Sequence, residues 1–447
     1  LSLENGIFYT TNMKKNILIL LLAFTTLACK NNENTGEDMA TAITNPEDYN
    51  KYLANLTAVE TPLFLQTRDS LENVLVTKPG NIVDASRVAS MYDETYNKTG
   101  DIDALLSYVR FRESVAANTA IKPENAYRLL AQAYIKTHQF QKADSVMKSF
   151  TKDYASPASM MVQFDVSMET GDYVLAKTLL DTLRNTKDYN YLIRAAKYND
   201  YAGELNNTIS LLEQATVLAE QSGNKEQLLW IYSNLGDYYG HHGDIEKSYN
   251  SYLKALELDP TNHYCLKGIA YIAYSHDEKP DEALRILNKL KESHKVPDYD
   301  LMMSEINEFK GDASKAQEHA SMFMKETSDS RYGGMYNLYK IEQWLGGDAS
   351  EKQQALTLAK AEIANRATPE TYGFLAEALL ANGDKEEALR VVEKYVENKT
   401  FEPVAALQMA MVYKAHGKTE ALEKLKEDLL GTRYEMGPVT YEKIKSL

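Results

Sequence analysis

Small side chains return along this chain at intervals of 32 to 40 residues, and this period constrains the fold more than any other feature. The positions are Ala104, Ala143, Ala176, Thr208, Ser248, Ala283, Ala316, Ala355, Ala388 and Ala421. A period of about 20 to 50 residues is typical of proteins built from stacked structural units. Apolar residues around these positions recur at i, i+3, i+4 and i+7, which predicts pairs of amphipathic helices. A larger side chain where paired helices cross would force them apart and cost about 1–3 kcal/mol.

A second repeated feature marks the turn between the two helices of each predicted pair. It is a Gly-Asp dipeptide, found at Gly100-Asp101, Gly171-Asp172, Gly243-Asp244, Gly311-Asp312, Gly347-Asp348 and Gly383-Asp384. Glycine suits the left-handed backbone position that ends a helix, and aspartate accepts hydrogen bonds from the free amides that begin the next. The distance from the Gly-Asp turn to the small residue that follows it is longer before Ala355 than in the other units. The phase of that unit is therefore ambiguous.

One unit, from Leu229 to Pro260, resembles the tetratricopeptide repeat. The residues that carry the resemblance are Tyr232, Leu235, Gly236, Tyr239, Ser248, Tyr252, Ala255 and Pro260. The same frame returns at Tyr127, Leu130, Ala131, Tyr134, Ala143 and Met147, and again at Tyr372, Leu375, Ala376, Leu379, Ala388 and Val392. The resemblance implies an all-α, right-handed superhelical solenoid of about ten helix-turn-helix repeats, with a concave and a convex face.

The N-terminal region has the order of a secretory signal. Met13-Lys14-Lys15 is followed by an apolar run from residue 17 to 24, and then by Thr26-Leu27-Ala28-Cys29. A cysteine directly after the small residue resembles a bacterial lipoprotein signal, and the resemblance implies cleavage before Cys29 and its acylation. Thr26 departs from the aliphatic residue usual at its position. The alternative is an ordinary secretory signal followed by an incidental cysteine.

These features predict the organisation of the whole chain. We expect upstream mis-translation at residues 1–12, a lipoprotein signal at 13–28, and an acylated cysteine with a flexible tether at 29–46. Capping helices are predicted at 47–84, the repeat array at 85–428 and a final capping helix at 429–447. Acyl chains would attach the protein to a membrane, and the predicted location is the cell envelope, with the outer membrane of a Gram-negative bacterium favoured.

The composition and the motifs limit the kinds of ligand and partner that we expect the protein to bind. The formal net charge of −15 argues against a nucleic-acid surface, because phosphate binding needs clustered lysine and arginine. Metal-ligand spacing, Gly-rich phosphate loops and a nucleophile elbow are missing from the sequence, so we expect no metal, no cofactor and no catalytic residues. Cys265 fits a small buried residue better than a reactive thiol.

In the family that the repeats resemble, the first helix of each unit lines the concave groove and its ninth position is exposed there. Those positions carry Asp93, Asp165, Asp237, Glu305 and Glu377, interrupted by Gln132, Lys197, Ile272, Ala410 and, in the ambiguous unit, Trp344. Five carboxylates on one stripe would attract a basic ligand, and the alternative is a solvated helix face. Arg128 and Trp230 complete the candidate groove residues. The Lys-Asn-Arg clamp for a peptide carboxylate is absent at the matching positions, and packing between repeats is the alternative for Trp230.

Three functions remain open at this stage. We favour an anchored scaffold that binds a protein or peptide segment. The segment would be basic if the acidic stripe is functional. A lipoprotein that captures glycan or peptide for a transporter is the second hypothesis, although only two tryptophans are present and the repeats lack long insertions. An enzyme is the third, and we expect no catalytic activity because no catalytic constellation was found.

Overall fold

A computed structural model of the chain describes residues 42–56, 60–120, 123–150 and 156–447. This part of the chain is helical and contains no strand. Two helices come first, α1 (Pro46–Ala54) and α2 (Pro62–Thr77). Ten helix pairs follow, and the first five are α3 (Ile82–Thr99) with α4 (Ile102–Asn118), α5 (Glu124–Lys136) with α6 (Phe140–Phe150), α7 (Pro157–Thr170) with α8 (Tyr173–Thr182), α9 (Tyr189–Tyr201) with α10 (Leu205–Ser222), and α11 (Lys225–His242) with α12 (Ile245–Leu258). The other five are α13 (His263–Ser275) with α14 (Pro280–Ser293), α15 (Asp298–Phe309) with α16 (Ala313–Thr327), α17 (Asn337–Leu345) with α18 (Ala349–Asn365), α19 (Pro369–Ala381) with α20 (Lys385–Val391) and its π-helical extension η2 (Val392–Val396), and α21 (Pro403–Ala415) with α22 (Thr419–Leu430). A short 3₁₀ turn, η1 (Ser330–Tyr332), precedes α17, and α23 (Arg433–Lys445) follows the last pair. The predicted all-α repeat solenoid is confirmed.

The ten small residues of the period all lie in the second helix of a pair. Eight of them are buried, and Ala316 and Ala421 are half-buried. Two of the period positions carry hydroxyls, and both hydroxyls bond back to the first helix. Ser248 Oγ donates to the carbonyl of Gly236 at 2.5 Å, and Thr208 Oγ1 donates to the carbonyl of Ala196 at 3.2 Å. These bonds satisfy buried hydroxyls that would otherwise be costly, which explains why serine and threonine can replace alanine there.

The Gly-Asp turns have the predicted geometry, except at one of the glycines and at one of the aspartates. Five of the six glycines have positive φ angles between 69° and 89°, and five of the six aspartates accept a hydrogen bond from an amide of the following helix. Asp244 makes no such bond. The prediction is wrong for Gly347, which is not left-handed. There α17 ends one residue earlier, and the side chain of Glu351 folds over Gly347 to complete a capping box with Asp348.

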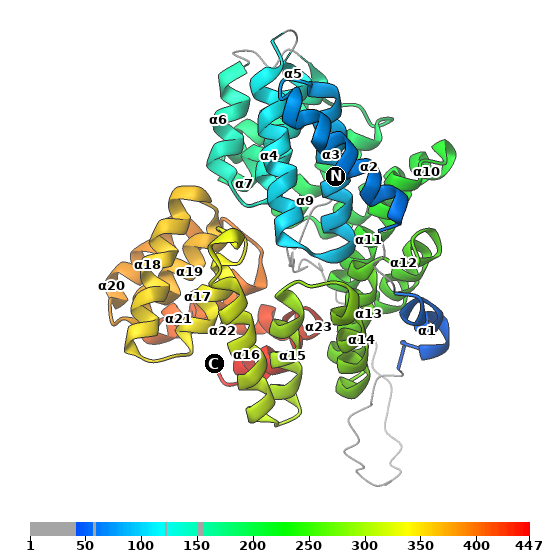
Figure 1. Cartoon of the computed structure of the whole chain (residues 1–447). Coiled ribbons are helices and arrows are strands. Elements are labelled where there is room, and N and C mark those ends of the chain that lie inside the picture. Colours follow the sequence, from blue (N-terminus) through cyan, green and yellow to red (C-terminus); the bar gives the residue numbers. More distant parts are fainter. Residues whose placement is uncertain (1–41, 57–59, 121–122, 151–155) are drawn as a thin grey trace, which may run out of the picture.

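The solenoid curls until its early and late repeats touch. The amide of Lys295 donates to the carbonyl of Thr99 at 2.8 Å, and Asn365 Nδ2 donates to the carbonyl of His138 at 2.9 Å. Beside these bonds, a side chain at Gly171 would collide with the backbone of Ala367. Figure 1 shows the α17–α21 region, in yellow and orange, returning to the side of the molecule where α6 and α7 lie. The concave face is therefore wrapped into an interior.

Helix α23 fills the space between the middle and the last repeats (Figure 1). It packs against α11, α13, α15, α21 and α22. Tyr271 Oη donates to the carbonyl of Glu435 at 2.8 Å, and Ser275 Oγ donates to the carbonyl of Tyr434 at 2.6 Å. The helix is interrupted at Gly437, whose φ of 74° is followed by Pro438. The carboxylate of Glu305 lies against Gly437 where any larger residue would place its Cβ, so glycine is needed there for both conformation and space.

Helix α1 lies apart from α2 and packs against α12 and α14 (Figure 1). The segment before it is held by Asp277, whose carboxylate accepts bonds from the amides of Ile43 and Thr44 at 3.0 and 2.8 Å. Burial would raise the pKa of Asp277, but these bonds and one from His276 lower it to about 2. The range 47–84, where we expected capping helices, holds α1, α2 and the beginning of α3. Of the two helices that precede the repeats, α2 packs on α3 and α1 does not.

The predictions for the N-terminal signal and anchor concern residues outside the described part of the chain. Residues 1–12, the signal at 13–28 and the acylation site Cys29 all lie before residue 42. Among the helices of the described part, none has the length and apolarity to span a membrane.

Candidate binding cavity

The wrapped concave face encloses a cavity of about 860 Å³. Its lining comes mainly from first helices of the pairs, namely α7, α9, α13, α15, α17, α19 and α21, together with α23. First helices therefore face the interior, as the family resemblance implied. The volume lies within the range of about 300–1,000 Å³ that is typical of ligand pockets. It suits a small ligand or a short stretch of peptide.

The cavity lining is acidic. Carboxylate side chains outnumber cationic side chains by nine to four. The carboxylates are Glu169, Asp200, Glu305, Glu308, Glu342, Glu362, Glu370, Glu377 and Glu402, and the cations are Lys197, Arg366, Lys414 and Lys443. Aromatic and aliphatic side chains such as Tyr339, Phe374 and Met436 separate these charges. An apolar lining with a few converging charges is what a selective ligand site requires.

Glu169 is neutralised by neighbouring residues. Lys197 Nζ lies 2.7 Å from one of its oxygens, and Arg366 Nη2 lies 3.0 Å from the other. Burial would raise the pKa of Glu169, but the two cations outweigh burial and hold the pKa at about 2. Two of the four cavity cations are therefore occupied in this ion-pair network, which joins α7 and α9 to the α18–α19 connection.

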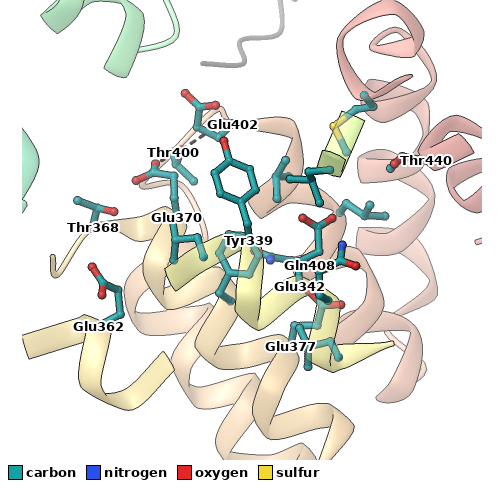
Figure 2. Close-up of a pocket in the computed structure, with 18 of the residues that line it drawn as sticks. Tyr339, Glu342, Glu362, Thr368, Glu370, Glu377, Thr400, Glu402, Gln408 and Thr440 are labelled. Atoms are coloured by element: carbon teal, nitrogen blue, oxygen red, sulfur yellow. Dashed lines mark hydrogen bonds between the residues drawn. The ribbon is translucent and has the colours of Figure 1, made fainter. Parts of the chain in front are cut away.

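Three other carboxylates form a cluster that lacks such partners. Glu305 comes from α15, Glu342 from α17 and Glu377 from α19. Figure 2 shows Glu342 and Glu377 close together with the amide of Gln408. Within the described part of the chain, none of the three carboxylates forms an ion pair, and Glu305 accepts one bond, from Tyr274 Oη at 3.0 Å. We call Glu305, Glu342 and Glu377 the carboxylate cluster.

Surrounding protein raises the pKa of each member of the carboxylate cluster. Burial raises the pKa of Glu305 and of Glu377 to about 7, and the charge of Glu342 adds to the shift in both. Burial also raises the pKa of Glu342, and Lys443 opposes the shift in all three. The Glu342 side chain is nevertheless exposed to solvent, so water in the cavity reaches it. The cluster is therefore hydrated, yet its full ionisation near neutral pH is opposed by the protein around it.

A second group of polar residues lies on the other side of Tyr339 (Figure 2). Thr400 Oγ1 donates to Glu370 at 2.7 Å and accepts from the amide of Glu402 at 3.1 Å. These bonds hold the last residues before α21 against the start of α19. Glu370 is thus engaged in structure, unlike the members of the carboxylate cluster.

The predicted acidic stripe is divided by the structure. Glu305 and Glu377 line the cavity, whereas Asp93, Asp165 and Asp237 do not. Asp93 pairs with Lys136 at 2.9 Å and Asp165 with Arg194 at 2.6 Å, each from the following repeat. Asp237 accepts hydroxyl bonds from Tyr252 at 2.6 Å and Tyr264 at 2.5 Å, and burial raises its pKa. These three aspartates connect repeats to each other.

The two remaining candidate residues also lie outside the cavity lining. Arg128 is half-buried and donates to Asn125 on its own helix. Trp230 packs edge-on to Tyr189 with ring centroids 6.3 Å apart, and its buried indole nitrogen makes no hydrogen bond. Neither side chain is brought together with Glu305 or Glu377.

Sequence reasoning missed Glu342, Gln408 and Lys443. Counting from the small residue Ala355 led to Trp344, but counting six residues back from the Gly-Asp turn, as in the units of Glu305 and Glu377, leads to position 341, beside Glu342. The turn would therefore have been the better reference in this unit. Gln408 lies two positions before the expected Ala410, and Lys443 lies outside the repeats, so no periodic signal marks either.

Comparison with known proteins agrees with this architecture. Residues 231–262, which run from within α11 to the residue directly before α13, match the family model described as tetratricopeptide repeat. That unit is one of ten helix pairs, so the described chain is an array of tetratricopeptide-type repeats, as predicted. A search of curated proteins found no significant match.

Similar solved structures were also found. PilF of Pseudomonas aeruginosa is 13% identical, with 48% of this chain and 97% of that chain covered at a TM-score of 0.35. A human IFIT1 dimer with PPP-AAAA is 14% identical, with 80% and 95% covered at a TM-score of 0.39. Yeast Tom70 is 13% identical, with 86% and 99% covered at a TM-score of 0.33. These likenesses are too distant to transfer a function to this chain.

Proposed function

We propose that this protein is a binding scaffold that holds a segment of another protein in its central cavity. The fold of paired helical repeats supports a role in protein–protein interaction. The observation that carries the proposal is the acidic, partly apolar cavity of about 860 Å³ on the concave face. Such a volume holds a few residues of a partner, so recognition would rest on a short segment and not on a long extended chain.

The scaffold is proposed to be anchored in the cell envelope through acylated Cys29, in the outer membrane of a Gram-negative bacterium. The described chain begins at residue 42, shortly before α1, which packs against α12 and α14. Thirteen residue steps separate Cys29 from that point, and they span at most about 45 Å when fully extended. The body would therefore remain close to the membrane surface, where envelope proteins are its natural partners.

Site-specific photo-crosslinking tests this function directly. The full chain, carrying a photoreactive benzoylphenylalanine at Tyr339 in the cavity, would be irradiated in intact membranes. We expect protein adducts from this position, identified by mass spectrometry, and none from the same group at Val174, which is 82% exposed on α8. Identical adducts from both positions, or no protein adduct at Tyr339, would contradict the scaffold.

Capture of glycan or peptide for a transporter is the second candidate. The cavity volume favours it as well, because the volume falls in the size range of small-ligand pockets. In the same experiment, adducts with small molecules and none with proteins at Tyr339 would favour capture. Both candidates are binding functions without catalysis. A hydrolase screen in which one cavity substitution abolished turnover would revive an enzyme.

A further inference from the structure

We propose that the carboxylate cluster and Gln408 form a subsite for one cationic side chain, a lysine ammonium or an arginine guanidinium, of the bound protein segment. This inference rests on the proposed function and adds the chemistry that the segment must present. It concerns Glu305, Glu342, Glu377 and Gln408, which come from four different helices, α15, α17, α19 and α21.

The first argument is the unbalanced charge of the cluster. Three carboxylates face one space, and none of them forms an ion pair within the described chain. Lys443 is the cation whose charge reaches all three, but its nitrogen is not within ion-pair distance of any. Carboxylates gathered in this way repel each other, and a cation placed among them relieves the repulsion.

The second argument is independent of charge and comes from Gln408. Gln408 is 98% buried, and neither Nε2 nor Oε1 makes a hydrogen bond of normal geometry, although the amide lies close enough to Glu377 to lower the pKa of that carboxyl. Oε1 of Gln408 occupies space that is free because Gly373 has no side chain. A buried amide without partners is costly, and a polar ligand that reached it would remove that cost. Gln408 lines the cavity, so its missing partners would come from the cavity.

Gln408 also indicates which source of cation is favoured. Its oxygen needs a donor and its NH₂ group needs an acceptor, whichever way the amide is turned. A lysine or arginine side chain supplies the donor, and the peptide carbonyls beside it supply the acceptor. A free polyamine carries donors alone when protonated and would leave the NH₂ group unsatisfied. The apolar side chains of Tyr339, Phe374 and Met436 suit the aliphatic stem of a basic residue.

Binding of a cation here would be linked to proton release. Glu305 also has Tyr274, Glu308 and Lys443 around it, and Glu377 has Glu342, Gln408 and Lys443. A cation among these groups favours the ionised carboxylates, so their raised pKa values would fall on binding. We therefore expect affinity to increase from pH 6 to pH 8, with protons released near pH 7.

Retention of blocked peptide libraries by the full chain tests the subsite. The chain would be purified in detergent and immobilised, and four heptapeptide pools would be applied, random except for a central Lys, Arg, Leu or Glu. We expect the Lys and Arg pools to be retained at least tenfold more than the Leu pool, and more at pH 8 than at pH 6. The triple variant E305Q/E342Q/E377Q should abolish this preference. The matched variant E318Q/E420Q/E423Q removes the same charge from exposed positions and should keep it.

Each other result overturns the inference in a recognisable way. Equal retention of the Lys and Leu pools would leave a peptide-binding cavity but remove the cationic subsite. A preference that survived in E305Q/E342Q/E377Q, with its helical circular-dichroism signal intact, would place the subsite elsewhere. Binding of spermidine without retention of any pool would assign the cluster to free polyamines. If nothing were retained, the subsite would be rejected, while the crosslinks from Tyr339 would decide separately whether the scaffold stands.

Discussion

Replacing Glu305 and Glu377 together by glutamine should stabilise the protein, and only at alkaline pH. Burial raises the pKa of each carboxyl from 4.5 to about 7 in the folded chain. Between those values the folded state binds more protons than the unfolded state. The native chain therefore keeps the associated stability below about pH 4.5 and loses it as the pH rises through about 7. Glutamine has the shape of the protonated acid and does not titrate, so the variant avoids this loss.

The size of the effect follows from the pKa values. A difference of about 2.5 in pKa corresponds to about 3 kcal/mol for each carboxyl. Both side chains face hydrated cavity space, so screening reduces this to about 1–2 kcal/mol each. The E305Q/E377Q variant should thus be about 2–4 kcal/mol more stable than the native chain at pH 8.5 and nearly equal to it at pH 4.5.

Thermal unfolding followed by circular dichroism at both pH values would measure this difference. Unfolding of a repeat array need not be two-state, so the comparison should use the shift in Tm between chains at each pH. The E318Q/E420Q variant, with the same charge change at exposed positions, should show no pH-dependent gain. A variant that was equally stable at pH 8.5, or stabilised by the same amount at both pH values, would refute the reasoning.

Three further predictions concern other parts of the molecule. Ala283→Leu, at a fully buried small-residue position, should destabilise the chain by about 1–3 kcal/mol; an unchanged Tm would contradict the close-packing argument. Asp277→Ala should free the segment before α1 and speed tryptic cleavage at Lys51, while Asp281→Ala, which is exposed, should not; equal rates would show that Asp277 does not hold the segment. Cys29→Ser should move the protein from the membrane to the soluble fraction on cell fractionation, and retention in the membrane would disprove acyl anchoring.

The part of the fold that the sequence could predict is the part set by neighbours in the chain. Ala143, Ala283 and Ala388 are buried because each lies where its own helix pair crosses, and that contact spans only about a dozen residues. The same is true of the Gly-Asp turns, whose bonds are local. Position Gly347 shows the limit even there, because a competing capping box with Glu351 took over the helix start.

The candidate site was harder to predict because it depends on contacts between distant repeats. Glu305 and Glu377 were found by their position in the repeat, but so was Asp165, which is neutralised by Arg194. Nothing in a single repeat distinguishes these outcomes. Contacts such as that of Asn365 with His138, 227 positions apart, arise from the sum of small rotations between many repeats. The period of the sequence does not encode that sum.

Because α23 is the last helix of the chain, the cavity is completed only at the end of folding. Met436, Val439 and Lys443 line the cavity, and they follow every repeat in chain order. Nascent helix pairs can stack one after another as they emerge, since each needs only its neighbour. The cavity therefore lacks part of its lining until α23 docks on α13. A chain that terminated a few residues after α22 would stack its repeats but would not complete the binding cavity.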